Sequence, residues 1–178
     1  MPRLFFSLWP EPAVREQLAV RGAALAALAQ GRAMRPHNLH MTLVFVGDVT
    51  DDRAAALLDC GAHIARDWHG EGRRGFTLGV DRAACFRRAR IAWLGCGAAE
   101  PLHLLQQKVL AAVMHLGAVV DAAEFRPHVT VARKIAAPYP DQPVEPAVEW
   151  LVTSFVLVES KVDDTGSDYR VVGEWALE

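Results

Sequence analysis

A short pattern that occurs twice constrains the fold of this chain more than any other feature. His40-Met41-Thr42-Leu43 and His128-Val129-Thr130-Val131 both read His, apolar, Thr, apolar, and each lies in a strand-like run, over 39–46 and 128–132. Because side chains alternate between the two faces of a strand, His and Thr share one face and the apolar pair points into the core. We therefore expect two strands that bring two imidazoles and two hydroxyls to one cleft.

The composition favours a globular protein of one domain, or of two small lobes that share an interface. The chain has 178 residues, of which 52% are hydrophobic, and a mean hydropathy of +0.11, which is ample for a core. A net charge of −2 and a pI near 6.4 exclude a generally basic, non-specific nucleic-acid binder, although not a local basic cleft. Most of the 19 basic residues are Arg, which reflects either a genomic bias or bidentate phosphate binding.

The cysteines and the first residues of the chain indicate the cellular compartment. Cys60, Cys85 and Cys96 are odd in number and do not have the spacing of metal ligands. The apolar run 4–9 is too short for a signal peptide, and no run is long enough to span a membrane. We therefore expect free thiols, a reducing cytoplasmic location and no membrane association.

Apolar spacing and chain-breaking residues predict an irregular alternation of helices and strands. Strands are expected over 4–9, 39–46, 76–80, 89–94, 128–132, 148–159 and 169–175, and helices over 12–30, from 51 and from 100. The first helix is expected to bury Val14, Leu18, Leu25 and Leu28, and the proline-rich segment 137–146 is expected to be a loop. Short hairpin-like connections favour antiparallel pairing, so we predict an α+β fold. Each motif follows a helix and opens a strand, which suggests an internal duplication with a pseudo-twofold axis.

His40 and His128 are the candidate catalytic residues. An imidazole, with an ordinary pKa of about 6.5, gives or takes a proton readily at neutral pH, so one ring would activate water and the other would protonate the leaving oxygen of a phosphate. The residues alone do not say which ring has which role. Thr42 and Thr130 are expected to donate hydrogen bonds to phosphate oxygens, unless they serve only the strand preference of Thr.

Two further candidates lie five positions after the motif histidines. Arg133 falls on the opposite face of a regular strand, unless a β-bulge or the strand end returns it to the cleft. Phe45 would either stack on the terminal base or pack in the core.

Other polar residues near the motifs are weaker candidates. Arg35, Arg126 and Lys134 flank the motifs and are candidates for a basic rim that binds a phosphate backbone. The Arg-rich segment 82–90 is more simply explained as a solvated hairpin. Tyr169 would reach the site from the last strand pair.

Taken together, these residues resemble the 2H phosphoesterase superfamily, and within it the LigT-like RNA 2′,3′-cyclic phosphodiesterases. The similarity is carried by residues 3–8, 38–49 and 125–133 and extends over essentially the whole chain. It implies one bilobal domain over 1–178 with one His-x-Thr-x motif in each half, at 40–43 and 128–131. Two antiparallel sheets would line a central cleft, with helices outside.

The resemblance also implies an activity. A 2′,3′-cyclic phosphate at an RNA end or on a nucleotide would be hydrolysed to a 2′-phosphate without metal or cofactor, with His40 as proton donor and His128 as proton acceptor. It supports phosphate or backbone binding at Arg133. Some relatives also join RNA ends through 2′-5′ linkages. No obligate protein partner is expected, and the protein is expected to be a monomer.

Two other functions fit parts of the pattern. A zinc hydrolase would use His40, His128 and a third His, but the sequence has no His-x-His or His-Glu-x-x-His grouping. A non-catalytic RNA or nucleotide-binding module would keep the fold and lose the chemistry.

Overall fold

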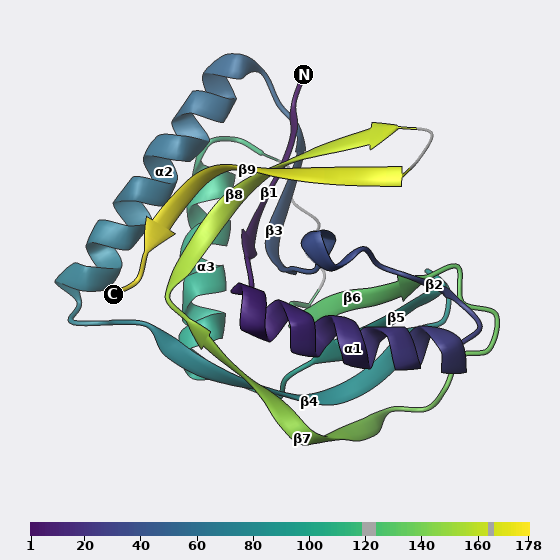
Figure 1. Cartoon of the computed structure of the whole chain (residues 1–178). Helices are drawn as coiled ribbons and strands as arrows, with labels where there is room; N and C mark the ends of the chain where they lie inside the picture. The colour runs from purple at the N-terminus through teal and green to yellow at the C-terminus, as the bar shows by residue number, and fades with distance from the viewer. Residues whose placement is uncertain (119–123, 164–165) are drawn as a thin grey trace.

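A computed structural model describes residues 1–118, 124–163 and 166–178 (Figure 1). Within these ranges the elements are β1 (Arg3–Leu8), α1 (Pro12–Leu28), β2 (Arg32–Ala33), the 3-10 turn η1 (Pro36–Asn38), β3 (Met41–Asp48), α2 (Asp51–Gly70), β4 (Phe76–Phe86), β5 (Ile91–Gly95), α3 (Glu100–His115), β6 (His128–Arg133), β7 (Gln142–Val152), β8 (Ser154–Asp163) and β9 (Gly166–Ala176). Each strand pairing recorded among them is antiparallel, which confirms the α+β fold class. None of the described helices is both long and apolar enough to cross a membrane.

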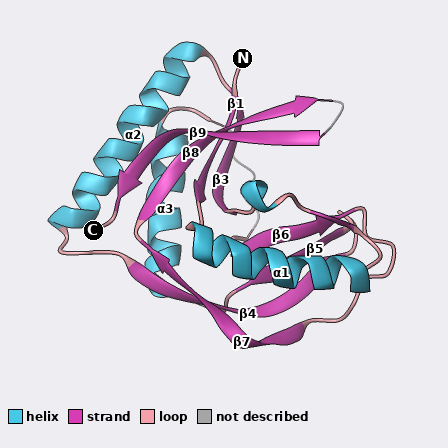
Figure 2. Ribbon diagram, viewed as in Figure 1, coloured by secondary structure: helices cyan, strands magenta, loops and turns pink. Residues whose placement is uncertain are grey.

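The two motif strands lie side by side at the centre of the sheet. The strand order is β7-β4-β5-β6-β3-β1-β8-β9, and the short β2 pairs with β6 (Figure 2). β3 and β6 are registered at one residue pair, Met41 opposite Val129, so the two expected antiparallel sheets join there into one nine-stranded sheet. This pair matches the second residue of one motif with the second residue of the other. The internal duplication itself stays a prediction.

The helices cover the apolar face of the motif strands. Met41, Leu43, Val129 and Val131 are buried in the main hydrophobic core, to which α1, α2 and α3 all contribute. α1 packs on β6, α3 on β3, and α2 on β8 and β9. His40, Thr42, His128 and Thr130 alternate with the core residues and occupy the other face, which we call the site face.

The first helix buries a different stripe from the expected one. Val14, Leu18, Gly22 and Ala26 are buried, whereas Leu28 is 55% exposed and Leu25 is only partly buried. A β-carbon at Gly22 would lie 2.9 Å from that of Val131, so the helix approaches β6 more closely than a larger residue would permit. Small residues therefore face the strand in this half of the helix, and the prediction for Leu28 was wrong.

The end of the chain also differs from the prediction. β7 begins at Gln142, inside the expected loop 137–146, and it tolerates Pro143 and Pro146 because it is an edge strand of the sheet. The strand expected over 148–159 is in fact two strands, since β7 ends at Val152 and β8 begins at Ser154. The chain crosses at this point from one half of the sheet to the other (Figure 1).

Candidate active site

A β-bulge in each motif strand directs the side chains of the site. In β3, Thr42 lies opposite Ser7 and Val44 opposite Phe6, so Leu43 is an extra residue. In β6, Thr130 lies opposite Trp93 and Ala132 opposite Ala92, so Val131 is extra. One extra residue shifts the alternation of side chains by one position. The residue five positions after each motif histidine is thereby returned to the site face.

Phe45 and Arg133 are the residues that the two bulges return. Phe45 lies opposite Phe5, whose ring contacts His40 at 4.9 Å between centroids, and it is 51% exposed. The charge of Arg133 acts on both His40 and His128. Phe45 is therefore an exposed aromatic ring on the site face and not a core residue, and Arg133 is a cation close to both imidazoles.

The motif histidines are held in the same way. Nδ1 of His40 lies 2.7 Å from the carbonyl oxygen of Asn38, and Nδ1 of His128 lies 2.7 Å from that of Arg126. A carbonyl oxygen only accepts hydrogen bonds, so Nδ1 of each ring carries the proton and donates it. Nε2 of each ring is left as the atom that takes or gives a proton at the site.

The register around Met41 and Val129 brings the four polar motif residues together. In an antiparallel pair, the neighbours of opposed residues lie across from one another on the other face. His40 is therefore placed beside Thr130, and Thr42 beside His128. All four side chains are half-buried. The register thus places the hydroxyl-bearing residue of each motif across from the histidine of the other.

Aromatic rings surround His40. Trp9 stacks on its ring at 5.6 Å between centroids and an angle of 13°, and Tyr169 meets it edge-on at 5.0 Å. Phe5 contacts both His40 and Tyr169. Tyr169 thus reaches the site from β9, as the sequence suggested.

His128 has a smaller aromatic neighbourhood. Phe86 meets its ring edge-on at 5.0 Å, and the centroid of Trp93 lies 6.0 Å away. The indole nitrogen of Trp93 is buried and, among the described residues, has no hydrogen-bond partner.

Burial favours the neutral form of both imidazoles. It lowers the pKa of His40 to about 4, and the positive charges of Arg133 and His128 act in the same direction, against the hydrogen bond to the Asn38 carbonyl. Burial also lowers the pKa of His128, with a further contribution from Arg133 and an opposing one from the Arg126 carbonyl. An anion bound between the rings would reverse part of this effect by stabilising their charged forms.

The other polar candidates lie at the surface. Arg35 and Lys134 are exposed, and Arg126, also exposed, pairs with Glu124 at 3.3 Å. Arg82 pairs with Asp141 at 3.5 Å. In the part of the chain that the structure describes, no three or more His, Cys, Asp or Glu side chains are grouped to hold a metal ion, and the three cysteines are free thiols.

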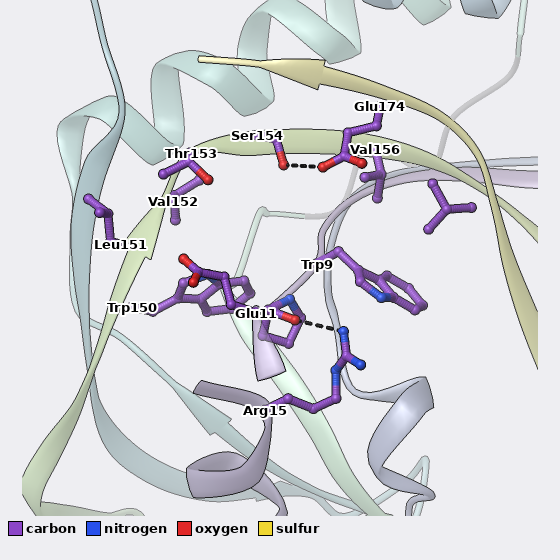
Figure 3. A pocket seen from close by; sticks show the side chains of 12 residues that line it. Trp9, Glu11, Arg15, Trp150, Leu151, Val152, Thr153, Ser154, Val156 and Glu174 are labelled. Atoms are coloured by element: carbon purple, nitrogen blue, oxygen red, sulfur yellow. Dashed lines mark hydrogen bonds between the residues drawn. The ribbon is translucent and has the colours of Figure 1, made fainter. Parts of the chain in front are cut away.

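A pocket of about 260 Å³ adjoins the site at Trp9 (Figure 3). It lies between the start of α1 and the strands β7, β8 and β9, and its lining mixes aromatic, apolar and charged side chains. Within it, Ser154 donates a hydrogen bond of 2.8 Å to Glu174, and Arg15 donates one of 2.8 Å to the carbonyl of Pro10. Nε of Arg15 is also buried, and it has no hydrogen-bond partner among the described residues.

Sequence reasoning missed four aromatic residues of the site: Phe5, Trp9, Phe86 and Trp93. Alternation along β1 would have separated Phe5 from its core neighbours, but only the pairing of β1 with β3 and β8 brings it to His40. Phe86 and Trp93 reach His128 through the β4–β5 hairpin and its pairing with β6.

Several known proteins resemble this chain in sequence and in overall fold. A family model described as the 2′-5′ RNA ligase superfamily matches residues 10–164. The RNA 2′,3′-cyclic phosphodiesterase of Escherichia coli (strain K12) is 30% identical over 98% of this chain and 96% of its own. The crystal structure of E. coli LigT complexed with 3′-AMP superposes with a TM-score of 0.84 at 29% identity, over 99% of each chain. The crystal structure of TT0787 of Thermus thermophilus gives 0.83 at 25% identity, over 98% of this chain and 97% of its own.

The resemblance to LigT-like 2H phosphoesterases that the two motifs suggested is confirmed by these matches. The chain belongs to the 2′-5′ RNA ligase superfamily.

Proposed function

We propose that this protein is an RNA 2′,3′-cyclic phosphodiesterase, a hydrolase that converts a terminal 2′,3′-cyclic phosphate to a 2′-phosphate. The observation that carries the proposal is the pair of motif imidazoles, each held at Nδ1 by a backbone carbonyl and each left with Nε2 for proton transfer. Relatives of similar length with this named activity, at 30% and 26% identity, support it.

The reaction requires one proton to be taken and one to be given. Water attacks the phosphorus atom, a new P–O bond forms, and Nε2 of His128 takes the proton of the water. The bond between phosphorus and the ribose O3′ breaks, and Nε2–H of His40 gives its proton to that oxygen. The product is a 2′-phosphomonoester, and exchange of protons with solvent restores both rings.

The other site-face residues would bind the substrate. The hydroxyls of Thr42 and Thr130 donate to the non-bridging phosphate oxygens, and the positive charge of Arg133 stabilises the negative charge on them. Phe45, exposed on the same face, offers a stacking surface for the terminal base, which requires no base preference.

The proton-donor role requires His40 to become charged when substrate binds. In the free protein its lowered pKa favours the neutral ring. A cyclic phosphate anion next to Nε2 raises that pKa, so binding of the substrate itself charges the acid. With the 5′-hydroxyl of a second RNA in place of water, the same chemistry would form a 2′-5′ linkage. The 5′ oxygen would attack the phosphorus atom of the cyclic phosphate and give its proton to His128, the bond to O3′ would break, and His40 would protonate O3′.

Its natural partners would be RNA ends or nucleotides that carry a 2′,3′-cyclic phosphate. We further propose a cytoplasmic monomer, in keeping with the three free thiols.

Hydrolysis of a short RNA that ends in a 2′,3′-cyclic phosphate, measured in the presence of a strong chelator, tests the proposal. Wild-type protein should release a 2′-phosphate end, and His40→Ala and His128→Ala should each lower the rate by about 10²-fold or more. His63→Ala is the matched control, because His63 also contacts a backbone carbonyl, that of Asp59, but is exposed on α2. It should react at the wild-type rate.

The outcomes separate the candidate functions. Activity lost in chelator and restored by Zn²⁺ would favour the zinc hydrolase. Wild-type protein that binds the RNA but never turns it over would favour the non-catalytic binding module.

A further inference from the structure

Exposed basic residues gather where β2, β5 and β6 meet. β2 pairs with the last residues of β6, so that Arg32 lies opposite Arg133, and Ile91 at the start of β5 lies opposite Arg133 on its other side. Arg87 and Arg88 occupy the turn just before β5, and Lys134 directly follows β6. We call the five exposed basic residues the basic end: Arg32, Arg87, Arg88, Arg133 and Lys134.

Arg90 links the turn before β5 to the segment that follows β6 through hydrogen bonds. Its side chain donates to the carbonyls of Ile135 at 3.0 Å and Lys134 at 3.3 Å, and its own carbonyl accepts from the backbone N–H of Ile135 at 3.2 Å. Arg90 and Lys134 both have positive φ angles, 54° and 57°, which residues other than glycine adopt at a cost in free energy. These hydrogen bonds hold the hairpin turn that contains Arg87 and Arg88 against residues 134–135, which follow β6.

These charges have no counter-ions in the described part of the chain. Among the residues that the structure describes, no side chain of the basic end makes an ion pair or a hydrogen bond, whereas nearby Arg82 is paired with Asp141. Arg32 and Arg133 are directly opposite each other, an arrangement that destabilises a sheet when the charges are alike. The chain as a whole carries a net charge of −2, so the excess of positive charge is local.

We propose that the basic end binds the phosphate backbone of the RNA whose terminal phosphate reacts at His40 and His128. This inference rests on the proposed function for the identity of the ligand. Arg133 belongs to both places, since its charge acts on both imidazoles and its strand neighbour is Arg32. We therefore expect the RNA backbone to extend from the reacting phosphate past Arg133 and Arg32 to the hairpin turn that contains Arg87 and Arg88.

Arginine is suited to this ligand. Four of the five residues are Arg, whose planar guanidinium binds phosphate oxygens through two parallel hydrogen bonds. The protein would consequently prefer an RNA chain to a mononucleotide, although both present the same reacting group.

The test measures binding and not turnover. A labelled RNA of about twelve nucleotides that ends in a 2′-phosphate is titrated with protein at several salt concentrations, and 2′-AMP serves as the mononucleotide. Arg32→Gln, and separately the double variant Arg87→Gln with Arg88→Gln, should weaken RNA binding by roughly tenfold and change 2′-AMP binding far less. The slope of log affinity against log salt should fall by about 0.7 for each lost phosphate contact on a single strand.

Two control variants remove the same number of charges elsewhere: Arg66→Gln matches the single variant, and Arg66→Gln with Arg74→Gln matches the double variant. Both residues are exposed, one on α2 and one just after it, and α2 lies on the other side of the molecule from β2 (Figure 1). These variants should bind both ligands like the wild type. The proposal is overturned if the basic-end variants behave like these controls, or if polyglutamate competes as well as RNA of equal charge.

This result does not depend on hydrolysis. Weaker RNA binding by the basic-end variants of a protein that hydrolyses nothing would support the basic end and count against the phosphodiesterase. If the protein hydrolyses a cyclic mononucleotide but the basic-end variants bind RNA like the wild type, the phosphodiesterase is supported and the role of the basic end is refuted.

Discussion

Replacing His40 by Phe should make the folded state less sensitive to acid. Burial lowers the pKa of His40 from 6.5 to about 4. The unfolded chain takes up a proton on this ring as the pH falls below 6.5, whereas the folded chain does so only near 4. In this interval the unfolded state binds more protons, so the contribution of His40 to stability decreases as the pH falls.

The two pKa values give the size of the effect. At about pH 7.5 the ring is neutral in both states, and at about pH 5 it is charged only in the unfolded state. The difference is close to 1.5 pH units, or about 2 kcal/mol of lost stability. A Phe ring would fit among Phe5, Trp9 and Tyr169 and never titrates. It leaves the Asn38 carbonyl without the Nδ1–H donor, at a pH-independent cost of about 1 kcal/mol.

The variant should therefore be less stable than wild type by about 1 kcal/mol near pH 7.5 and more stable by about 1 kcal/mol near pH 5. Urea unfolding followed at both pH values measures this reversal. His63→Phe, on the exposed face of α2, should differ from wild type by the same amount at both. A constant gap between His40→Phe and wild type would refute the assignment of a low pKa to burial.

Two further predictions concern catalysis. Burial lowers the pKa of both motif histidines, so the pH profile of kcat/KM should be bell-shaped with its maximum below pH 6.5. The acid limb reports the ring that must be neutral, and the alkaline limb reports the ring that must be charged. The kcat profile should peak at higher pH, since bound phosphate raises both pKa values, and a kcat/KM maximum above pH 7 would contradict the burial argument. Thr130→Val keeps the shape and strand preference of the residue but removes the hydroxyl, so kcat should fall by about 10²-fold, whereas Thr77→Val, exposed on β4, should leave it unchanged. An undiminished kcat in Thr130→Val would mean that this hydroxyl does not bind the reacting phosphate.

The local pattern of each motif was sufficient to predict which side chains share a face. Alternation put His40 and Thr42 together and turned Met41 and Leu43 to the core, as the structure has them. Such a prediction succeeds because the period of a strand depends on neighbouring residues only.

Alternation failed for the residues beyond the motifs. It put Arg133 on the wrong face, and only the bulges at Leu43 and Val131 return Arg133 and Phe45 to the site face. A bulge is defined by the partner strand, and the partners β1 and β5 are distant in sequence from β3 and β6, respectively. The same reason explains why the strand expected over 148–159 was not seen to divide between two halves of the sheet.

The sequence by itself was sufficient to predict the fold class, the family resemblance and the shared face of the four motif residues, because each of these depends on a local pattern of residues. Only the tertiary structure decided what surrounds His40 and His128: the aromatic rings, the carbonyls that hold Nδ1, and the burial that lowers both pKa values. It also decided that Arg32 meets Arg133. These features depend on the register between strands that are far apart in the chain, and that register results from packing of the whole core.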